Sequence, residues 1–166
     1  MLELKALPRE AVPAALDKAE HYRFLNEPRE AESICLDVLA IEPDNQRAAR
    51  TLLLALTDQF DRDLAGIFDR AREAARRLED DYSRAYYGGI VFERAAKARL
   101  RRGGPHANFI AHDWLQQALE HFEAAEKLAP AGNPDATLRW NTCVRLFQSN
   151  PALRSGTPEL EHQMLE

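Results

Sequence analysis

The segments AESICLDVLAIEP, residues 31–43, and ALEHFEAAEKLAP, residues 118–130, decide the fold of this chain. In each, a small residue is followed by apolar residues four and then three positions later, and by a proline five positions beyond the last of these. The two sets are Ala31, Cys35, Val38, Pro43 and Ala118, Phe122, Ala125, Pro130. The four-three step keeps side chains on one face of an α-helix, and the proline ends the helix. The repeated spacing predicts stacked helical hairpins.

Length and composition predict one soluble helical domain. The chain has 166 residues, which is long enough to form a substantial core. Hydrophobic residues make up 45% of it and charged residues 30%. Its net charge of -5 argues against a protein that uses electrostatic attraction to bind nucleic acid or an anionic membrane. The start, MLELKALPRE, lacks the apolar core of a signal peptide, and no run of eighteen apolar residues occurs. We therefore expect a cytoplasmic protein.

Apolar residues recur at helical spacing along most of the chain, and no window alternates as a strand does. Prolines and glycines divide this pattern into seven expected helices, with Asp61 as a cap between the third and fourth. Their approximate ranges are 12–26, 28–42, 46–60, 63–78, 81–102, 108–128 and 134–148. The prediction is an all-α domain over 1–148, followed by a polar tail over 149–166 that is in part helical.

Two glycines, Gly88 and Gly89, lie inside the fifth expected helix. Glycine costs a helix interior about 1 kcal/mol relative to alanine, so its presence there needs a reason. We expect a neighbouring helix to approach the backbone closely at this point. Cys35 and Cys143 each lie within an apolar helical pattern and are expected to be reduced core thiols.

Helix pairs that repeat about every 34 residues resemble tetratricopeptide repeats. In the first unit, Ala19 and Tyr22 match the family's small and aromatic positions in its first helix, and Ala31 matches the small start of its second helix. Pro43-Asp44-Asn45 matches the exit of the repeat. The resemblance implies a right-handed superhelical stack of about three hairpins, with units at 12–45, 46–80 and 81–130 and a capping helix over 134–148 that contains Trp140.

The later units depart from the family pattern. Asp69 and Arg72 stand where the second unit should have apolar residues. In the third unit, Gly89 and Ala118 are 29 residues apart, whereas the matching Ala19 and Ala31 are 12 apart. Seventeen extra positions must lengthen either the helices or the loop between them.

The resemblance implies a non-enzymatic scaffold or adaptor that binds a partner peptide or helix in a concave groove. A secretion-type chaperone with such repeats is an alternative, and self-association is open. The groove positions of the family correspond to Leu16, Glu20, Arg23, Phe24, Arg50, Leu54, Asp58, Tyr86, Ile90 and Arg94. Leu16 and Glu20 replace the lysine and asparagine with which some members hold a chaperone's terminal carboxylate, so we do not expect that ligand.

Positive charge concentrates at the end of the fifth helix, at Lys97, Arg101 and Arg102, before Gly103-Gly104. Cations there offset the helix dipole, and glycine provides a left-handed cap. A functional interpretation is a surface for an acidic partner segment. The phosphate-binding motif GxxxxGK[ST] is missing from this loop, so the loop itself is a weaker phosphate candidate.

Three histidines, His106, His112 and His121, lie in or near the extra positions of the third unit. Their separations do not match an i, i+4 metal-binding pair, and we expect structural or surface roles. The alternative from another class is an enzyme that depends on a metal or phosphate ligand held by residues 101–112. We expect no catalytic residue, metal or cofactor, and a partner that is a protein rather than nucleic acid or membrane.

Overall fold

The computed structural model describes residues 1–153, and within them the chain is entirely helical, with no strand. The α-helices are α1 (Val12–Phe24), α2 (Pro28–Ile41), α3 (Gln46–Thr57), α4 (Phe60–Arg76), α5 (Asp81–Arg102), α6 (Ala107–Leu128) and α7 (Asp135–Ser149). Short 3-10 turns, η1 (Arg9–Ala11) and η2 (Pro151–Leu153), precede α1 and follow α7. The all-α prediction is confirmed, and every expected helix is present.

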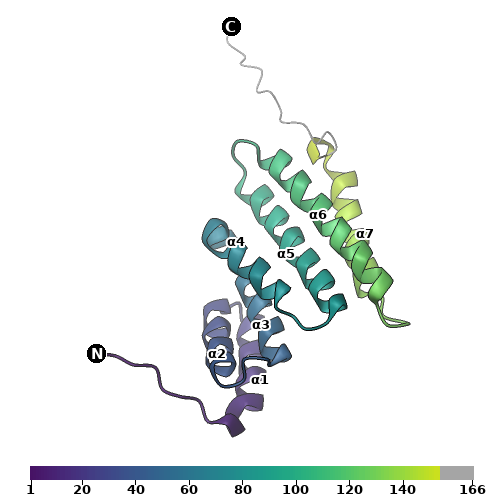
Figure 1. Cartoon of the computed structure of the whole chain (residues 1–166). Coiled ribbons are helices and arrows are strands. Elements are labelled where there is room, and N and C mark those ends of the chain that lie inside the picture. Colours follow the sequence, from purple (N-terminus) through teal and green to yellow (C-terminus); the bar gives the residue numbers. More distant parts are fainter. Residues whose placement is uncertain (154–166) are drawn as a thin grey trace.

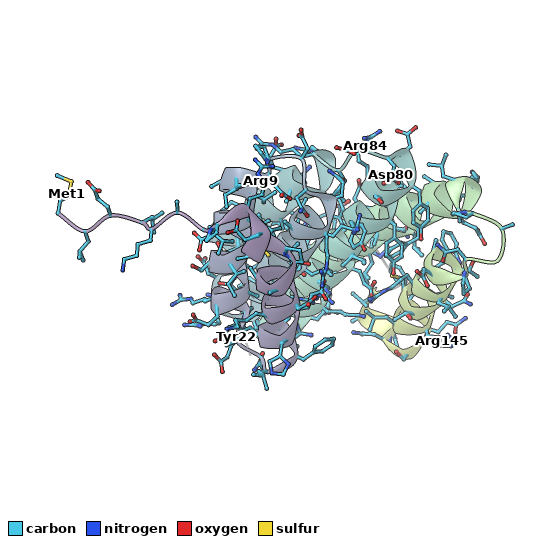
Figure 2. All side chains as sticks on the ribbon, turned by 90° about the horizontal axis from the view of Figure 1, so that it is seen from below. Met1, Arg9, Tyr22, Asp80, Arg84 and Arg145 are labelled. Carbon is cyan, nitrogen blue, oxygen red and sulfur yellow. The ribbon has the colours of Figure 1, made fainter. Side chains whose placement is uncertain are left out.

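Each helix packs against the next one along the chain, and α1 also contacts α3, which in turn contacts α5. Figure 1 shows α1 to α4 gathered at one end of the molecule and α5, α6 and α7 side by side at the other. The residues before η1 extend away from the helices, with Met1 far from the body of the protein (Figure 2). None of the helices within residues 1–153 is long and apolar enough to cross a membrane.

The two repeated segments form packing surfaces, as their spacing predicts. Ala31, Cys35 and Val38 of α2 are fully buried. Ala118, Phe122 and Ala125 of α6 are fully buried too. Both cysteines are free core residues, and burial raises the pKa of each thiol to about 12.

Helix α4 contains a break that corrects the expected cap. Asp63 has non-helical backbone angles, φ -151° and ψ 71°, and its Oδ1 accepts a hydrogen bond from the backbone N–H of Gly66 at 2.9 Å. Asp63 therefore caps the longer part of α4. Asp61, which we expected to cap this helix, instead accepts a hydrogen bond from Arg101 Nε at 2.9 Å.

The extra positions of the third unit lie in its helices. Helices α5 and α6 have 22 residues each, whereas α1 and α2 have 13 and 14. The connection over 103–106 is short, and Gly103, with φ 68°, ends α5 in a backbone conformation that suits glycine.

The long α5–α6 pair meets closely at the two helix-interior glycines. A Cβ atom on Gly89 would lie 2.5 Å from Cε1 of Phe122, and one on Gly88 would lie 2.8 Å from Cε1 of His121. Both distances are far below van der Waals contact. The predicted close approach at these glycines is confirmed.

The packed body continues past residue 148, where we expected the domain to end. Leu153 in η2 is fully buried, and its carbonyl oxygen lies 2.5 Å from Nδ1 of His112 on α6. The 3-10 turn η2 is the last described element of the chain. The remainder of the tail, 154–166, lies outside the described residues.

We expect Gly89→Ala to lower the free energy of unfolding by up to about 2 kcal/mol. The new methyl group meets the Phe122 ring, and overpacking a core costs about 1–3 kcal/mol, of which the better helix propensity of alanine offsets about 1 kcal/mol. Urea denaturation followed by circular dichroism measures the change. Phe122→Leu should make room for the methyl group, so the same substitution should cost less in that background. Equal costs in the two backgrounds would contradict the packing argument.

Candidate binding site on the face of α1, α3, α5 and α7

Eight of the ten predicted groove residues line three neighbouring pockets formed mainly by the odd-numbered helices. A first pocket of about 410 Å³ lies between α1, α3 and α5, and a small one of about 230 Å³ lies between α5 and α7. Between them is a pocket of about 400 Å³. It shares Arg23 and Phe24 with the first and Arg139 with the small one, so the three form a continuous row.

The other two predicted groove residues do not line these pockets. Leu16 and Ile90 are each only 2% exposed. Leu16 packs with Val12 and Val38 between α1 and α2, and Ile90 packs in the core that contains Phe122. Their apolar side chains are removed from water by the helix behind them, which corrects their assignment to the groove.

We call the central pocket the arginine pocket. Its lining residues come from α1, the α1–α2 turn, α3, α4, α5 and α7, and most of them are charged. They are Arg23, Phe24, Asn26, Thr57, Asp58, Asp61, Arg94, Lys97, Arg101 and Arg139. The pocket joins residues of the predicted groove with Lys97 and Arg101 of the predicted acidic-partner patch. Arg102, the third residue of that patch, is exposed and is not among the lining residues.

In the first charged group of the pocket, two arginines share one carboxylate. Arg23 Nε donates to Asp58 Oδ2 at 2.7 Å, and Arg94 Nη1 donates to Asp58 Oδ1 at 2.7 Å. Arg94 Nη1 also donates to the hydroxyl oxygen of Thr57 at 2.7 Å. The three charged side chains come from α1, the end of α3 and α5, so this group links the two ends of the molecule.

The second charged group repeats this arrangement around Glu93. The side chain of Glu93 is fully buried in α5, and its Oε1 accepts from Lys97 Nζ at 2.5 Å. Arg139 of α7 approaches the same carboxylate, with Nη1 at 3.4 Å from Oε1. Lys97 and Arg139 are about one-third exposed and reach the pocket, whereas Glu93 lies behind them.

Charge in the arginine pocket is unbalanced toward positive. Five cationic side chains line it, and Asp58, Asp61 and Glu93 are the three carboxylates that pair with them, which leaves a surplus of two positive charges. The whole chain, by contrast, carries a net charge of -5. The pocket is therefore a local positive region on an acidic protein.

The pKa of Arg94 shows how these charges act on one another. Burial lowers this pKa most, Asp58 opposes the decrease, and the charges of Arg23 and Arg139 lower it further. Cations from α1 and α7 thus converge on Arg94, and an anion placed among them would be favoured.

Phe24 gives the pocket row an apolar contact. Its side chain is 87% exposed at the end of α1, and it lines both the arginine pocket and the adjacent pocket. Exposed rigid aromatic side chains are effective anchors for a partner.

The three histidines singled out from the sequence occupy separate structural positions. His106 precedes α6 with φ 59°, His112 lies beside Leu153, and His121 stacks on Phe92 with ring centroids 5.6 Å apart. Within residues 1–153, no group of three or more His, Cys, Asp or Glu side chains is arranged to hold a metal ion. Aromatic side chains of α5 also form ring contacts here, including stacked Tyr82 and Tyr86 with centroids 5.7 Å apart.

Arg139 and Glu93 were not predicted from the sequence as residues of the site. Glu93 stands four residues before Lys97 on α5, a spacing that favours an ion pair on a helix, and this was a usable signal. Arg139 had no comparable signal, because its role depends on where α7 lies relative to α5.

Comparison with known proteins found no matching family model, no significantly similar curated protein and no significantly similar solved structure.

We expect His121 to make stability depend on pH. Burial is the main cause of the lowered pKa of His121, with Glu120 opposing and Arg72 contributing. The unfolded chain binds a proton at this residue near pH 6.5, while the folded chain resists it. The free energy of unfolding should therefore fall as pH drops from 7.5 to 5.5. His121→Asn should reduce that slope, measured by urea denaturation, and an unchanged slope would contradict this assignment. Between pH 7.5 and 9 the two proteins should show the same slope.

We expect Glu93→Gln to lower the free energy of unfolding by about 2 kcal/mol, since it removes the buried charge that Lys97 and Arg139 share. The matched control is Glu123→Gln, which removes an exposed partner of Lys127 and should cost less than about 0.5 kcal/mol. Thermal and urea unfolding provide the measurements. Similar losses in the two variants would show that Glu93 does not organise the pocket.

Proposed function

We propose that this protein is a non-enzymatic docking scaffold of the tetratricopeptide-repeat type, and that its α1–α3–α5–α7 face binds an acidic segment of a partner protein. The observation that carries the proposal is the arginine pocket, where five cations meet only three carboxylates. The consecutive helix pairs and the α1–α3 and α3–α5 contacts support a repeat arrangement.

The row of pockets fits an extended segment better than a compact ligand. The pockets run from Glu20 and Arg47 on one side, through the arginine pocket, to Asp135 and Thr142 on the other. Such a row offers several shallow contacts along a chain. The central positive charge would orient an acidic segment, and Phe24 would bind an apolar side chain next to it.

The two outer pockets differ in charge from each other, which gives the row a direction. In the first pocket, Arg47 is bound by Glu20, with Nε and Oε1 2.8 Å apart, and by Asp17. In the small pocket, Asp135 accompanies Arg139. The first pocket is also lined by Arg50. Acidic residues of the partner are therefore favoured at the centre of the row and on its α1–α3 side more than at its α7 end.

We expect Arg101→Glu to weaken binding of an acidic segment about tenfold, because it removes a pocket cation and places a carboxylate beside Asp61. The probe is a fluorescein-labelled degenerate 11-residue peptide library with a fixed central Asp-Glu-Asp, measured by fluorescence polarisation against the full chain. A library with a central Lys-Arg-Lys should bind at least about tenfold more weakly.

The neighbouring Arg102→Glu is the matched control. It makes the same charge change in the same last turn of α5, but Arg102 does not line the pocket, so binding should change less than about threefold. Equal effects of the two variants would show that binding responds to the overall charge of the protein rather than to the arginine pocket. Equal binding of the acidic and basic libraries would overturn the proposal.

A further inference from the structure

We propose, on the basis of the acidic-segment function above, that the arginine pocket receives a dianionic phosphoryl group, carried by a phosphorylated serine or threonine of the partner segment. The carrying observation is that two separate carboxylates, Asp58 and Glu93, are each shared by two cations at one pocket.

Each of these charged groups has one positive charge more than its carboxylate neutralises. In the first, Arg23 and Arg94 share Asp58, and in the second, Lys97 and Arg139 share Glu93. The remaining pair, Arg101 and Asp61, is neutral as a unit. The surplus of two charges thus has a definite origin, one from each group, rather than being a diffuse property of the surface.

The carboxylates also hold the cations in position. Asp58 accepts from Nε of Arg23 at 2.7 Å and from Nη2 at 3.3 Å, which uses one edge of that guanidinium. A guanidinium has five N–H donors, so Arg23 keeps further donors for an anion in the pocket. Planar guanidinium groups match the oxygens of a phosphoryl group and donate to two of them at once.

A single carboxylate would offset only half of the surplus. A phosphorylated side chain carries about -1.5 to -2 charges at neutral pH and has three strong acceptor oxygens on one atom. It can therefore interact with both charged groups at once from within a pocket of about 400 Å³. Two carboxylates from adjacent residues would have to enter the same space on separate side chains.

This site is distinct from the glycine loop, since Gly103 and Gly104 are not among the residues that line the arginine pocket. The donors are side chains of α1, α5 and α7, so assembly of the site depends on the tertiary fold. Phe24 and Asn26 also line the pocket and offer an apolar and a polar contact to the residues that flank the phosphorylated position.

The experiment compares three degenerate 11-residue libraries that differ only in the fixed central residue, which is phosphoserine, aspartate or serine. Binding to the full chain is measured by fluorescence polarisation at pH 7.5. We expect the phosphoserine library to bind at least about tenfold more tightly than the serine library and about fivefold more tightly than the aspartate library. The advantage over aspartate should shrink at pH 5.5, because the second phosphate pKa is about 6.

One variant from each charged group tests the origin of the preference. Arg23→Gln leaves Asp58 paired with Arg94, and Arg139→Gln leaves Glu93 paired with Lys97, so no carboxylate loses both partners. Each should cut the advantage of phosphoserine over aspartate to about twofold or less. Arg145→Gln, an exposed change on the same helix as Arg139 (Figure 2), should leave the advantage unchanged. Melting temperatures identify any variant that fails to fold. If Arg23→Gln or Arg139→Gln does not fold, the remaining variant of the two tests the preference for phosphoserine.

The outcomes separate this inference from the proposed function. If the phosphoserine and aspartate libraries bind equally, and both bind more tightly than the serine library, the proposed preference for a dianionic group is wrong. The acidic-segment function would still stand. Equal binding of all three libraries would overturn both. Binding of N-acetyl-phosphoserine amide alone, as tight as that of the library, would replace the partner segment with a small phosphorylated ligand and so overturn the inference.

Discussion

The close contact between α5 and α6 is the constraint on which the rest of the structure depends. Gly88 and Gly89 let the backbone of α5 approach the rings of His121 and Phe122, closer than any side chain would allow. Once that face of α5 is committed to α6, the faces that carry Glu93, Arg94 and Lys97 are fixed relative to α1, α3 and α7. The two glycines contribute no group to the arginine pocket, yet they determine which side chains of α5 reach it.

The carboxylates of the pocket have an organising role rather than a simple stabilising one. Burying Glu93 costs free energy that its ion pairs with Lys97 and Arg139 must offset, and buried pairs often yield little net stability. Their effect is to hold flexible cationic side chains in one arrangement. Cations fixed in this way lose less conformational entropy when an anion binds. The ion pairs therefore increase the affinity for an anion more than they increase the stability of the fold.

The helices were predicted well from the sequence because the start and end of a helix depend on residues close to them in the chain. Prolines, glycines and apolar periodicity determine where each helix can run, and Pro28 at the start of α2 is a clear example. The candidate site was predicted only in part. Leu16 and Ile90 were placed in the groove from a family pattern, but apolar side chains turn toward the core when a helix covers them. Arg139 could not be predicted, because its contact with Glu93 joins α7 to α5 across 46 residues.

The contrast between the pocket and the rest of the chain bears on specificity. An acidic protein repels acidic segments weakly at most points of its surface, and it attracts them where cations outnumber carboxylates. With a net charge of -5 overall and a surplus of two positive charges at one pocket, the attraction is confined to a small area. The negative charge of the rest of the chain thus acts against nonspecific binding of a long uniform anion, because the parts of it that extend beyond the positive region are repelled by a protein of net charge -5. A short segment with one concentrated negative group avoids that repulsion, because its charge enters the pocket while its flanks carry little.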